Sequence, residues 1–332
     1  MTDTPLIAAE NVSRRFARKL DVAERIAGAL GVKVEERVVH AVDGISLAIR
    51  PREIVGLVGE SGCGKSTFGR VLAGILPQSD GSVAWEGRDL TSLDRAEKKA
   101  VRLATQMIFQ DPMSSLNPRK TVAGIVGEAP VAHGLVSRGE IAETVGALLD
   151  RVGLDRTYAH RYPHQFSGGQ RQRIGIARAL AVRPKFLVCD ESVSALDVSI
   201  QAQILNLFME LRDELGLTYL FISHDLGVVK HISDRVAIMY LGRIVETAPA
   251  EEFFAAPNHP YTTALIAEMP TIAGRRRKFQ PIKGEIPSPV HPPSGCHFHP
   301  RCPKAFDRCR VERPVLREIT PNHLSACHLN DL

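Results

Sequence analysis

The sequence has few aromatic residues, no long apolar run and only a mild charge excess. Aromatic side chains make up 5% of 332 residues, and the formal net charge is +5. Nucleic-acid-binding proteins usually combine a stronger basic stripe with interleaved aromatics, so that class is disfavoured. No apolar stretch approaches the ~20 residues of a membrane-spanning helix. The first ten residues also lack the pattern of a signal peptide, so we expect a cytoplasmic chain that reaches a membrane only through partners.

Cysteine is sparse except near the C-terminal end. Cys63 and Cys189 stand alone and are expected to be small buried residues, whereas four more cysteines lie close together at Cys296, Cys302, Cys309 and Cys327. Because a cytosolic chain keeps its thiols reduced, this grouping favours a bound metal over disulfides. The C-x₅-C-x₆-C-x₁₇-C spacing differs from a zinc knuckle. It leaves three alternatives open: a [4Fe–4S] cluster, Zn²⁺, or reduced structural thiols. Three histidines are near enough to replace a cysteine ligand: His297, His299 and His328.

One glycine-rich stretch has a specific chemical meaning. It fits G-x-x-x-x-G-K-[ST] and reads Gly59, Glu60, Ser61, Gly62, Cys63, Gly64, Lys65, Ser66, Thr67. A short apolar run precedes it and a helical pattern follows, as a phosphate-binding loop requires. Lys65 is expected to contact the β- and γ-phosphates, and Ser66 to offer its hydroxyl to Mg²⁺. The sequence therefore predicts a nucleoside triphosphate site, and the flanks disfavour a chance glycine-rich turn.

Two adjacent carboxylates end a second apolar run. Residues 186–189 read Phe-Leu-Val-Cys and are followed by Asp190 and Glu191. Ligands of α/β proteins bind at the carboxyl ends of parallel strands, where Asp190 can hold Mg²⁺ and Glu191 can orient the attacking water. The alternative is a pair of acids at an ordinary strand end. The phosphate loop earlier in the chain makes that alternative weaker.

A second candidate anion site begins another helical pattern. It reads Ser167, Gly168, Gly169, Gln170. A serine N-cap followed by glycines exposes backbone N–H groups at a helix start, where an anion binds favourably. One ATP needs one phosphate cradle. We therefore expect a second chain, identical or related, to present this segment to the opposite nucleotide.

Strand-like and helical patterns alternate, which predicts an α/β fold with a covered parallel sheet. Strand patterns occupy residues 6–12, 41–49, 52–58, 80–87, 105–110, 185–190, 218–223 and 235–240. Helical patterns occupy residues 68–75, 141–152, 170–181, 201–215 and 226–233. Residues 17–40 form an insertion, either a surface helix that contacts a partner or lipid, or a solvated excursion. We divide the chain into a nucleotide-binding domain (1–255) with a helical subdomain at about 111–182, and a small irregular cysteine-containing extension (256–332), entered by a proline-rich connector at 270–293.

In this order, the motifs resemble those of the ATP-binding subunits of ABC transporters. The resemblance rests on the phosphate loop, Gln110, the Ser167–Gln170 segment, Asp190 with Glu191, and residues 194–197 and 224. It implies a P-loop NTPase fold and a head-to-tail dimer that encloses two ATP molecules. It also implies that Gln110 links Mg²⁺ and water to membrane subunits, that Asp197 lies at the dimer contact, and that His224 senses the γ-phosphate. Phe16 resembles the residue that stacks on adenine, although core packing is an alternative and His40 could lie nearby.

Further segments resemble the oligopeptide/dipeptide importers within this family. They are residues 110–118, 162–173, 259–262 and 292–296. The resemblance implies an energy-coupling ATPase at the cytoplasmic face of the bacterial inner membrane. Its partners would be a second ATPase subunit that is related but non-identical, two permease subunits and, indirectly, an extracytoplasmic solute-binding protein. It also favours a [4Fe–4S] cluster at the four tail cysteines. Importers for nickel or glutathione share these features, so they remain alternatives. Ser192 departs from the proline common in the family, with little consequence expected because both acids are intact.

Two other classes fit less well. Soluble ABC proteins of translation or DNA repair usually carry two nucleotide domains or a long coiled-coil insertion, and neither pattern is found here. A small-molecule kinase has no use for the Ser167–Gln170 segment. An ATPase that drives a membrane transporter is therefore the function that the sequence predicts.

Overall fold

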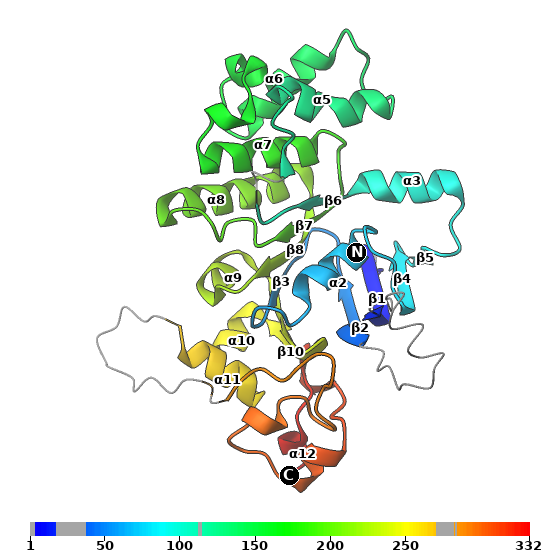
Figure 1. The fold of residues 1–332 in the computed structure, drawn as a ribbon, viewed down its shortest axis with the longest axis vertical. Helices are drawn as coiled ribbons and strands as arrows, with labels where there is room; N and C mark the ends of the chain where they lie inside the picture. The colour runs from blue at the N-terminus through cyan, green and yellow to red at the C-terminus, as the bar shows by residue number, and fades with distance from the viewer. Residues whose placement is uncertain (1–3, 18–37, 112–114, 270–281, 283) are drawn as a thin grey trace, which may run out of the picture.

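A computed structural model describes residues 4–17, 38–111, 115–269, 282 and 284–332. Helices gather at one end of an elongated molecule, two sheets lie in the middle, and the C-terminal extension forms the other end (Figure 1). Most of the predicted insertion at 17–40 and much of the connector at 270–293 lie outside the described residues.

The main sheet has eight strands in the order β11-β12-β10-β9-β3-β8-β7-β6. Its parallel part contains β9 (Arg235–Tyr240), β3 (Ile54–Val58), β8 (Thr218–Ser223), β7 (Phe186–Asp190) and β6 (Thr105–Ile108). Every residue of β3, β7 and β8 is buried, which is why these strands are nearly continuous apolar runs. The α/β fold with a parallel sheet is thus confirmed.

Alternate residues of β8 pack into two different apolar cores. Tyr219 and Phe221 belong to a core with the helices of the upper end, whereas Leu220 and Ile222 belong to a core with α2 (Lys65–Leu72) and the second sheet. This period-two distribution is the geometry of a strand covered on both faces. The sheet therefore has no free face at this strand, and its carboxyl end becomes the place where side chains can meet a ligand.

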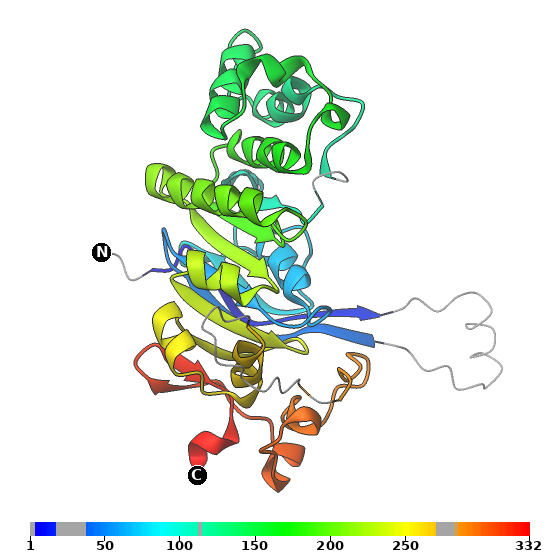
Figure 2. The same ribbon diagram turned by 90° about the vertical axis from the view of Figure 1, so that its left-hand side faces the viewer.

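The second sheet is antiparallel and has the order β2-β1-β4-β5. Its strands are β2 (Val38–Ile49), β1 (Ile7–Ala17), β4 (Asp80–Trp85) and β5 (Arg88–Asp89). The outer ends of β1 and β2 project from the body of the molecule as a ribbon (Figure 2). Helix α3 (Arg95–Ala104) then leads into β6; Asp94 caps it, with Glu97 completing a reciprocal capping box.

The upper end is helical and includes the helical patterns predicted at 141–152 and 170–181. It contains α5 (Val122–Ala132), α6 (Ile141–Arg151), the 3-10 turns η1 (Arg156–His160) and η2 (Pro163–Gln165), and α7 (Gly168–Leu180). Helix α8 (Val198–Leu215) lies between this group and the sheet (Figure 2), and it ends at Gly216, whose φ of 67° suits glycine. Buried side chains of α5–α8 form one apolar core with the sheet, so the helical group is packed onto the nucleotide domain.

The chain then passes α9 (Leu226–Ile232), β10 (Arg243–Pro249), α10 (Ala250–Ala255) and α11 (Pro260–Ala267) before the extension. The extension contains η3 (His299–Arg301), α12 (Asp307–Val311), β11 (Arg317–Thr320), β12 (His323–Ser325) and η4 (His328–Asp331). Its helices and turns are short, as expected, but β12 pairs antiparallel with β10. The extension is therefore less irregular than the sequence suggests, because two of its segments continue the main sheet.

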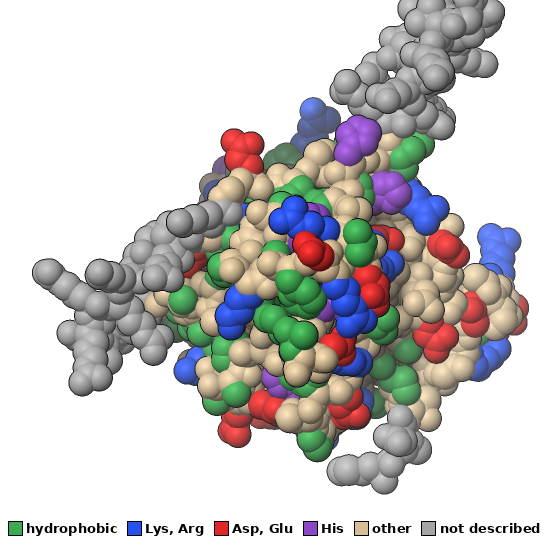
Figure 3. All heavy atoms as spheres, turned by 90° about the horizontal axis from the view of Figure 1, so that it is seen from below, with side chains coloured by type: hydrophobic (Ala, Val, Ile, Leu, Met, Phe, Trp, Pro, Cys, Tyr) green, Lys and Arg blue, Asp and Glu red, His purple; other side chains and the backbone are tan. Residues whose placement is uncertain are grey.

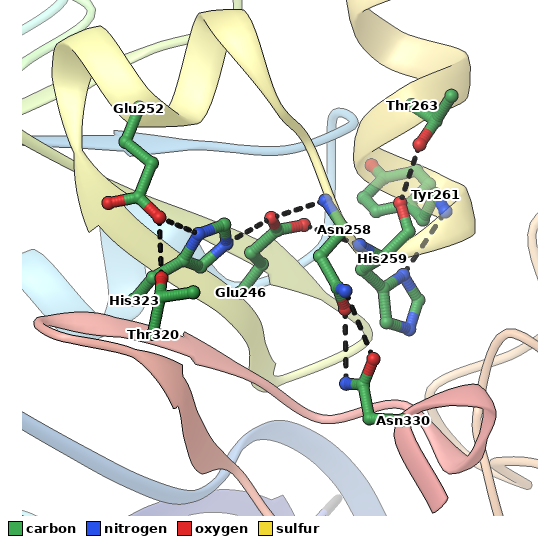
Figure 4. A network of polar contacts seen from close by, with 9 residues as sticks. All are labelled: Glu246, Glu252, Asn258, His259, Tyr261, Thr263, Thr320, His323 and Asn330. Atoms are coloured by element: carbon green, nitrogen blue, oxygen red, sulfur yellow. Dashed lines mark hydrogen bonds and ion pairs between the residues drawn. The ribbon is translucent and has the colours of Figure 1, made fainter. Parts of the chain in front are cut away.

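A buried polar network joins β10 to the extension (Figure 4). His323 Nε2 lies 2.7 Å from Glu246 Oε1, and its Nδ1 lies 3.0 Å from Glu252 Oε1. The same Glu246 carboxylate accepts the backbone N–H groups of Asn258 and His259, both at 2.8 Å. Outside this buried network, the end face of the molecule is a mixture of basic, acidic, histidine and hydrophobic side chains (Figure 3).

Candidate functional site

The predicted phosphate loop connects β3 to α2 and folds closely against the sheet. A Cβ added at Gly59 would lie 2.1 Å from the carbonyl oxygen of Met239, and one at Gly64 would lie 1.9 Å from that of Ala41. Gly64 also has a φ of +106°, which side chains disfavour. Both positions therefore require glycine for a physical reason that the motif alone does not state.

Lys65 is turned back over its own loop. Its side chain is buried, and Nζ donates to the carbonyl oxygens of Gly59 at 2.7 Å and Glu60 at 3.1 Å. These two carbonyls hold the ammonium inside the loop, and no carboxylate of the described residues pairs with it. The ammonium thus faces the concave side of the loop, where an anionic ligand can reach it.

Ser66 and Asp190 meet although 124 positions separate them. Ser66 Oγ donates to Asp190 Oδ1 at 2.7 Å. Burial raises the pKa of Asp190, and the hydrogen bond from Ser66 lowers it by less. A buried carboxylate beside a hydroxyl, at the carboxyl end of β7, has the oxygen donors that Mg²⁺ prefers.

Three other predicted residues meet next to this pair. Gln110 Nε2 donates to Glu191 Oε2 at 2.7 Å, and His224 Nδ1 lies 3.5 Å from the same oxygen. Glu191 has a φ of 47°, a left-handed conformation that is unusual for a residue with a side chain. The backbone therefore holds the carboxylate in a special position at the end of β7, as is common at functional sites.

The Ser167–Gln170 segment opens α7 and lies apart from the phosphate loop. Ser167 Oγ accepts from the Gln170 N–H at 3.4 Å, and Gln170 Oε1 accepts from the Ser167 N–H at 3.0 Å. Gly169 packs against Ile200, where an added Cβ would come within 2.5 Å. Both of these hydrogen bonds run within the segment, and neither reaches residues 59–67. Asp197, the N-cap position of α8, is exposed and makes no side-chain capping bond.

Phe16 lies near the outer end of β1, opposite Val39 of β2. Its side chain is 37% exposed, and the Arg14 guanidinium stacks 4.7 Å from the ring centroid. The ring is therefore not part of the apolar core, and stacking on a base remains the prediction for it. His40 lies beside Val39 and pairs with Arg15, so it is close along the same ribbon. Ser61 and Gly62 are exposed in the loop, whereas Thr67 is partly covered.

All six cysteines are free thiols. Cys63 and Cys189 are buried, as predicted, and burial raises the pKa of each. The four tail cysteines surround one small cavity of about 10 Å³, which also borders His259, His299 and His328. Burial raises the pKa of Cys296 to about 11, and repulsion from the other three thiols adds to the shift. The structure thus brings together four residues that the sequence spreads over 32 positions.

The donor set of this thiol pocket suits a soft metal centre, but the side chains are not arranged around one. Among the described residues, no group of three or more histidine, cysteine or acidic side chains is placed to hold a metal ion. The cavity has room for about one water, so the thiols would have to move apart to admit a cluster. Two observations are compatible with a bound metal centre. Four thiols that form no disulfide converge on the cavity, and the buried His259 Nε2 beside it has no hydrogen-bond partner among the described residues.

Two residues that contact the phosphate loop, Tyr261 and Arg301, are not among the site residues predicted from the sequence. The carboxylate of Glu60 pairs with Arg301, and the Glu60 N–H donates to the hydroxyl of Tyr261. These partners lie 241 and 201 positions from Glu60. No local pattern could have found them, because the contact exists only after the extension has packed on the sheet.

Comparison with known proteins agrees with this geometry. The family described as ABC transporter matches residues 42–194, and the one described as oligopeptide/dipeptide transporter, C-terminal region, matches residues 245–309. The oligopeptide transport ATP-binding protein AppF of Bacillus subtilis is 51% identical over 88% of this chain and 90% of its own. The protein named OppF of Escherichia coli is also 51% identical, over 88% of each chain.

Solved structures show the same fold. The chain resembles CbiO1 of Clostridium perfringens, described as part of an ABC transporter complex, with a TM-score of 0.63 and 26% identity over 76% of this chain and 92% of that one. It resembles the dimeric ATP-binding cassette MJ0796 with ADP and phosphate, with a TM-score of 0.61 and 26% identity over 74% and 98%. In the described part of the chain, no helix is long and apolar enough to cross a bilayer. The chain therefore belongs to the ATP-binding subunits of ABC transporters, and it is an ATPase that uses ATP and Mg²⁺, from the branch that carries the oligopeptide/dipeptide transporter C-terminal region.

Proposed function

We propose that this ATPase drives the import of oligopeptides or dipeptides. The observation that carries the proposal is a cassette site joined to a C-terminal region found in peptide transporters. The names of AppF and OppF, each 51% identical to this chain, describe oligopeptide transport. Other subunits would select the peptide, because the site residues described above bind and hydrolyse ATP.

The proposed chemistry is transfer of the γ-phosphoryl group to water. Lys65, whose ammonium the carbonyls of Gly59 and Glu60 hold at the loop, binds the β- and γ-phosphates. Ser66 and Asp190 hold Mg²⁺, which neutralises charge on the phosphates. Glu191 orients the attacking water and accepts its proton. Gln110 and His224 flank its carboxylate, so both can report the state of the nucleotide.

We propose that the complete nucleotide site needs a second ATPase subunit. A head-to-tail arrangement is supported by the exposure of two separate segments. Ser61 and Gly62 are exposed in the phosphate loop, and Ser167 and Gly168 are exposed at the start of α7. In that arrangement, residues 167–170 of one subunit contact the nucleotide that is bound to the phosphate loop of the other subunit. Asp197 lies at the contact between the two subunits. Phe16 stacks on the adenine of the ATP bound by its own subunit. The partner is a related, non-identical chain.

The remaining partners follow from the same proposal. Two permease subunits receive the motion of the dimer through Gln110 and the helical subdomain, and a solute-binding protein delivers the peptide outside. The chain works peripherally at the cytoplasmic face of the bacterial inner membrane. We place the nucleotide-binding domain at residues 1–255, its helical subdomain at about 111–182, and the extension at 256–332.

We further propose that the thiol pocket binds a [4Fe–4S] cluster, with Zn²⁺ as the alternative. The ligands would be Cys296, Cys302, Cys309 and Cys327. Anaerobic purification should give about four iron atoms per chain, with a broad visible absorption that disappears when the ligands are changed to serine. An anaerobic preparation with one zinc and no iron would support the alternative, and a metal-free one would exclude both.

The decisive experiment is peptide uptake by vesicles that contain the assembled transporter. The expected result is that the vesicles take up labelled di- or oligopeptides only when ATP is supplied. Vesicles that contain the Glu191→Gln variant should take up none. Matched vesicles receive nickel or glutathione instead. Uptake of one of those solutes and not of peptides would overturn the substrate assignment while leaving the ATPase assignment intact.

A further inference from the structure

Glu60 is the second residue of the phosphate loop, and all of its polar groups are held. Its carbonyl oxygen accepts from Lys65 Nζ at 3.1 Å, and its N–H donates to the hydroxyl of Tyr261 at 3.0 Å. Its carboxylate receives two parallel bonds from Arg301, at 2.7 and 2.9 Å. One residue therefore connects the lysine that binds phosphate to two residues on the C-terminal side of the molecule.

The ion pair between Glu60 and Arg301 is well shielded. The Arg301 side chain is 5% exposed and that of Glu60 is 22% exposed. Two parallel N–H···O bonds fix direction as well as distance, which a single contact to a point charge cannot do. Arg301 also donates to the hydroxyl of Tyr240 at 3.3 Å, so its own position is fixed by the end of β9.

Tyr261 is fixed by aromatic packing. Its ring is buried, with its centroid 4.7 Å from that of Tyr240 and 5.3 Å from that of Phe298. These edge-to-face and tilted contacts leave the hydroxyl one position, beneath the loop. Tyr261 comes from α11 and Phe298 from the extension, so two segments after β10 cooperate in placing this single acceptor.

We propose that Arg301 and Tyr261 are positioning residues for ATP binding, which hold Glu60, and through its carbonyl Lys65, in the arrangement that receives the triphosphate. They do not touch the nucleotide in this scheme. They set the shape of the loop, because Glu60 cannot rotate its peptide or move its carboxylate without breaking a bond to one of them. The C-terminal side of the chain thus determines how well the cassette binds ATP.

The test is equilibrium binding of a fluorescent ATP analogue, with Mg²⁺, to the full chain. Tyr261→Phe removes one hydroxyl and keeps the packed ring, and Arg301→Lys keeps the charge and loses the parallel pair. Loss of one hydrogen bond of ordinary strength should raise Kd about three- to tenfold in each variant. In the assembled transporter the fall in kcat/KM should come mainly from KM.

Arg308→Lys is the matched control. Arg308 also makes two parallel bonds to a glutamate, Glu312, but the pair lies within the extension. This variant should keep the Kd of the unchanged chain. Kd values within twofold of the unchanged chain for both Tyr261→Phe and Arg301→Lys would overturn the proposal, as would an equal loss of affinity in Arg308→Lys.

A double substitution tests the route through Glu60. If Arg301 acts on the loop through the Glu60 carboxylate, Glu60→Gln combined with Arg301→Lys should bind ATP no more weakly than the poorer single variant. Additive losses would overturn that route. Tyr261→Phe acts on the backbone N–H instead, so it remains a test even if Arg301→Lys does not fold.

Discussion

The buried contact between β10 and the extension predicts the effect of removing His323. Both ring nitrogens of His323 face carboxylate oxygens, and its partner Glu246 is fully buried. His323→Ala would leave Glu246 with two backbone N–H donors but without its cationic or polar side-chain partner. The register of β10 with β12 contains only two residue pairs, so this side chain supplies a large share of the polar connection.

The size of the effect follows from burial. Removing one partner of a buried, hydrogen-bonded pair costs about 3–5 kcal/mol. Because Glu246 keeps the N–H groups of Asn258 and His259, we take the lower limit, about 3 kcal/mol. At an unfolding entropy of about 2.1 cal/mol/K per residue, that loss lowers the midpoint of thermal unfolding of the whole chain by about 4 °C.

The assay combines calorimetry with hydrogen exchange of the peptide that spans residues 317–332. Faster exchange of this peptide than of β8 in His323→Ala would show that the extension detaches first. The matched control is His291→Ala, since His291 is an exposed histidine of the same extension and surface substitutions stay within about 0.5 kcal/mol. Equal midpoints for the two variants would refute the reasoning.

Three further predictions concern the nucleotide site. Glu191→Gln keeps the contact distance to Gln110 but cannot accept a proton, so hydrolysis should fall at least about 100-fold while ATP binding persists. Gel filtration of this variant together with the second ATPase subunit should show an accumulated dimer, and unchanged turnover would contradict the role. Ser167→Arg should abolish hydrolysis by the assembled transporter without changing ATP binding to the isolated chain, and weaker binding there would place the segment in its own site. Gly64→Ala should abolish ATP binding in an isothermal titration, because its Cβ would clash with the Ala41 carbonyl; normal affinity would show that the loop can relax.

The chemistry of the site could be predicted from sequence because it depends on local rules. A phosphate loop is a strand, a turn and a helix start in one short segment. The contact of Ser66 with Asp190 crosses 124 positions, yet it follows from the rule that parallel strands present their carboxyl ends at one edge. For Phe16 the sequence leaves two roles open, core packing and stacking on adenine. The exposure of its ring depends on how far β1 projects from the body of the molecule, and the neighbouring residues in the sequence do not determine that.

The extension could not be predicted in the same way. Strands β11 and β12 are four and three residues long, and their residues carry no alternation that predicts a strand. They become strands because β10 offers them a template. The pairing of Arg301 with Glu60 depends on that docking as well. The grouping of four cysteines near the C-terminal end predicts that their thiols come together. The size of the cavity between them depends on how the extension packs, which the spacing of the cysteines does not determine.

The docking of β12 on β10 also determines where the main sheet ends. Without it, β10 would present unpaired backbone groups, such as the Val245 carbonyl that now accepts the Ala326 N–H. An open edge of this kind recruits strands from other chains. The edge that replaces it, β11, is short and carries exposed Arg317 and Glu318, which disfavour such pairing. Strands β11 and β12 therefore protect the sheet edge of the cassette against pairing with other chains, and a variant designed to remove the thiol pocket should retain residues 317–325.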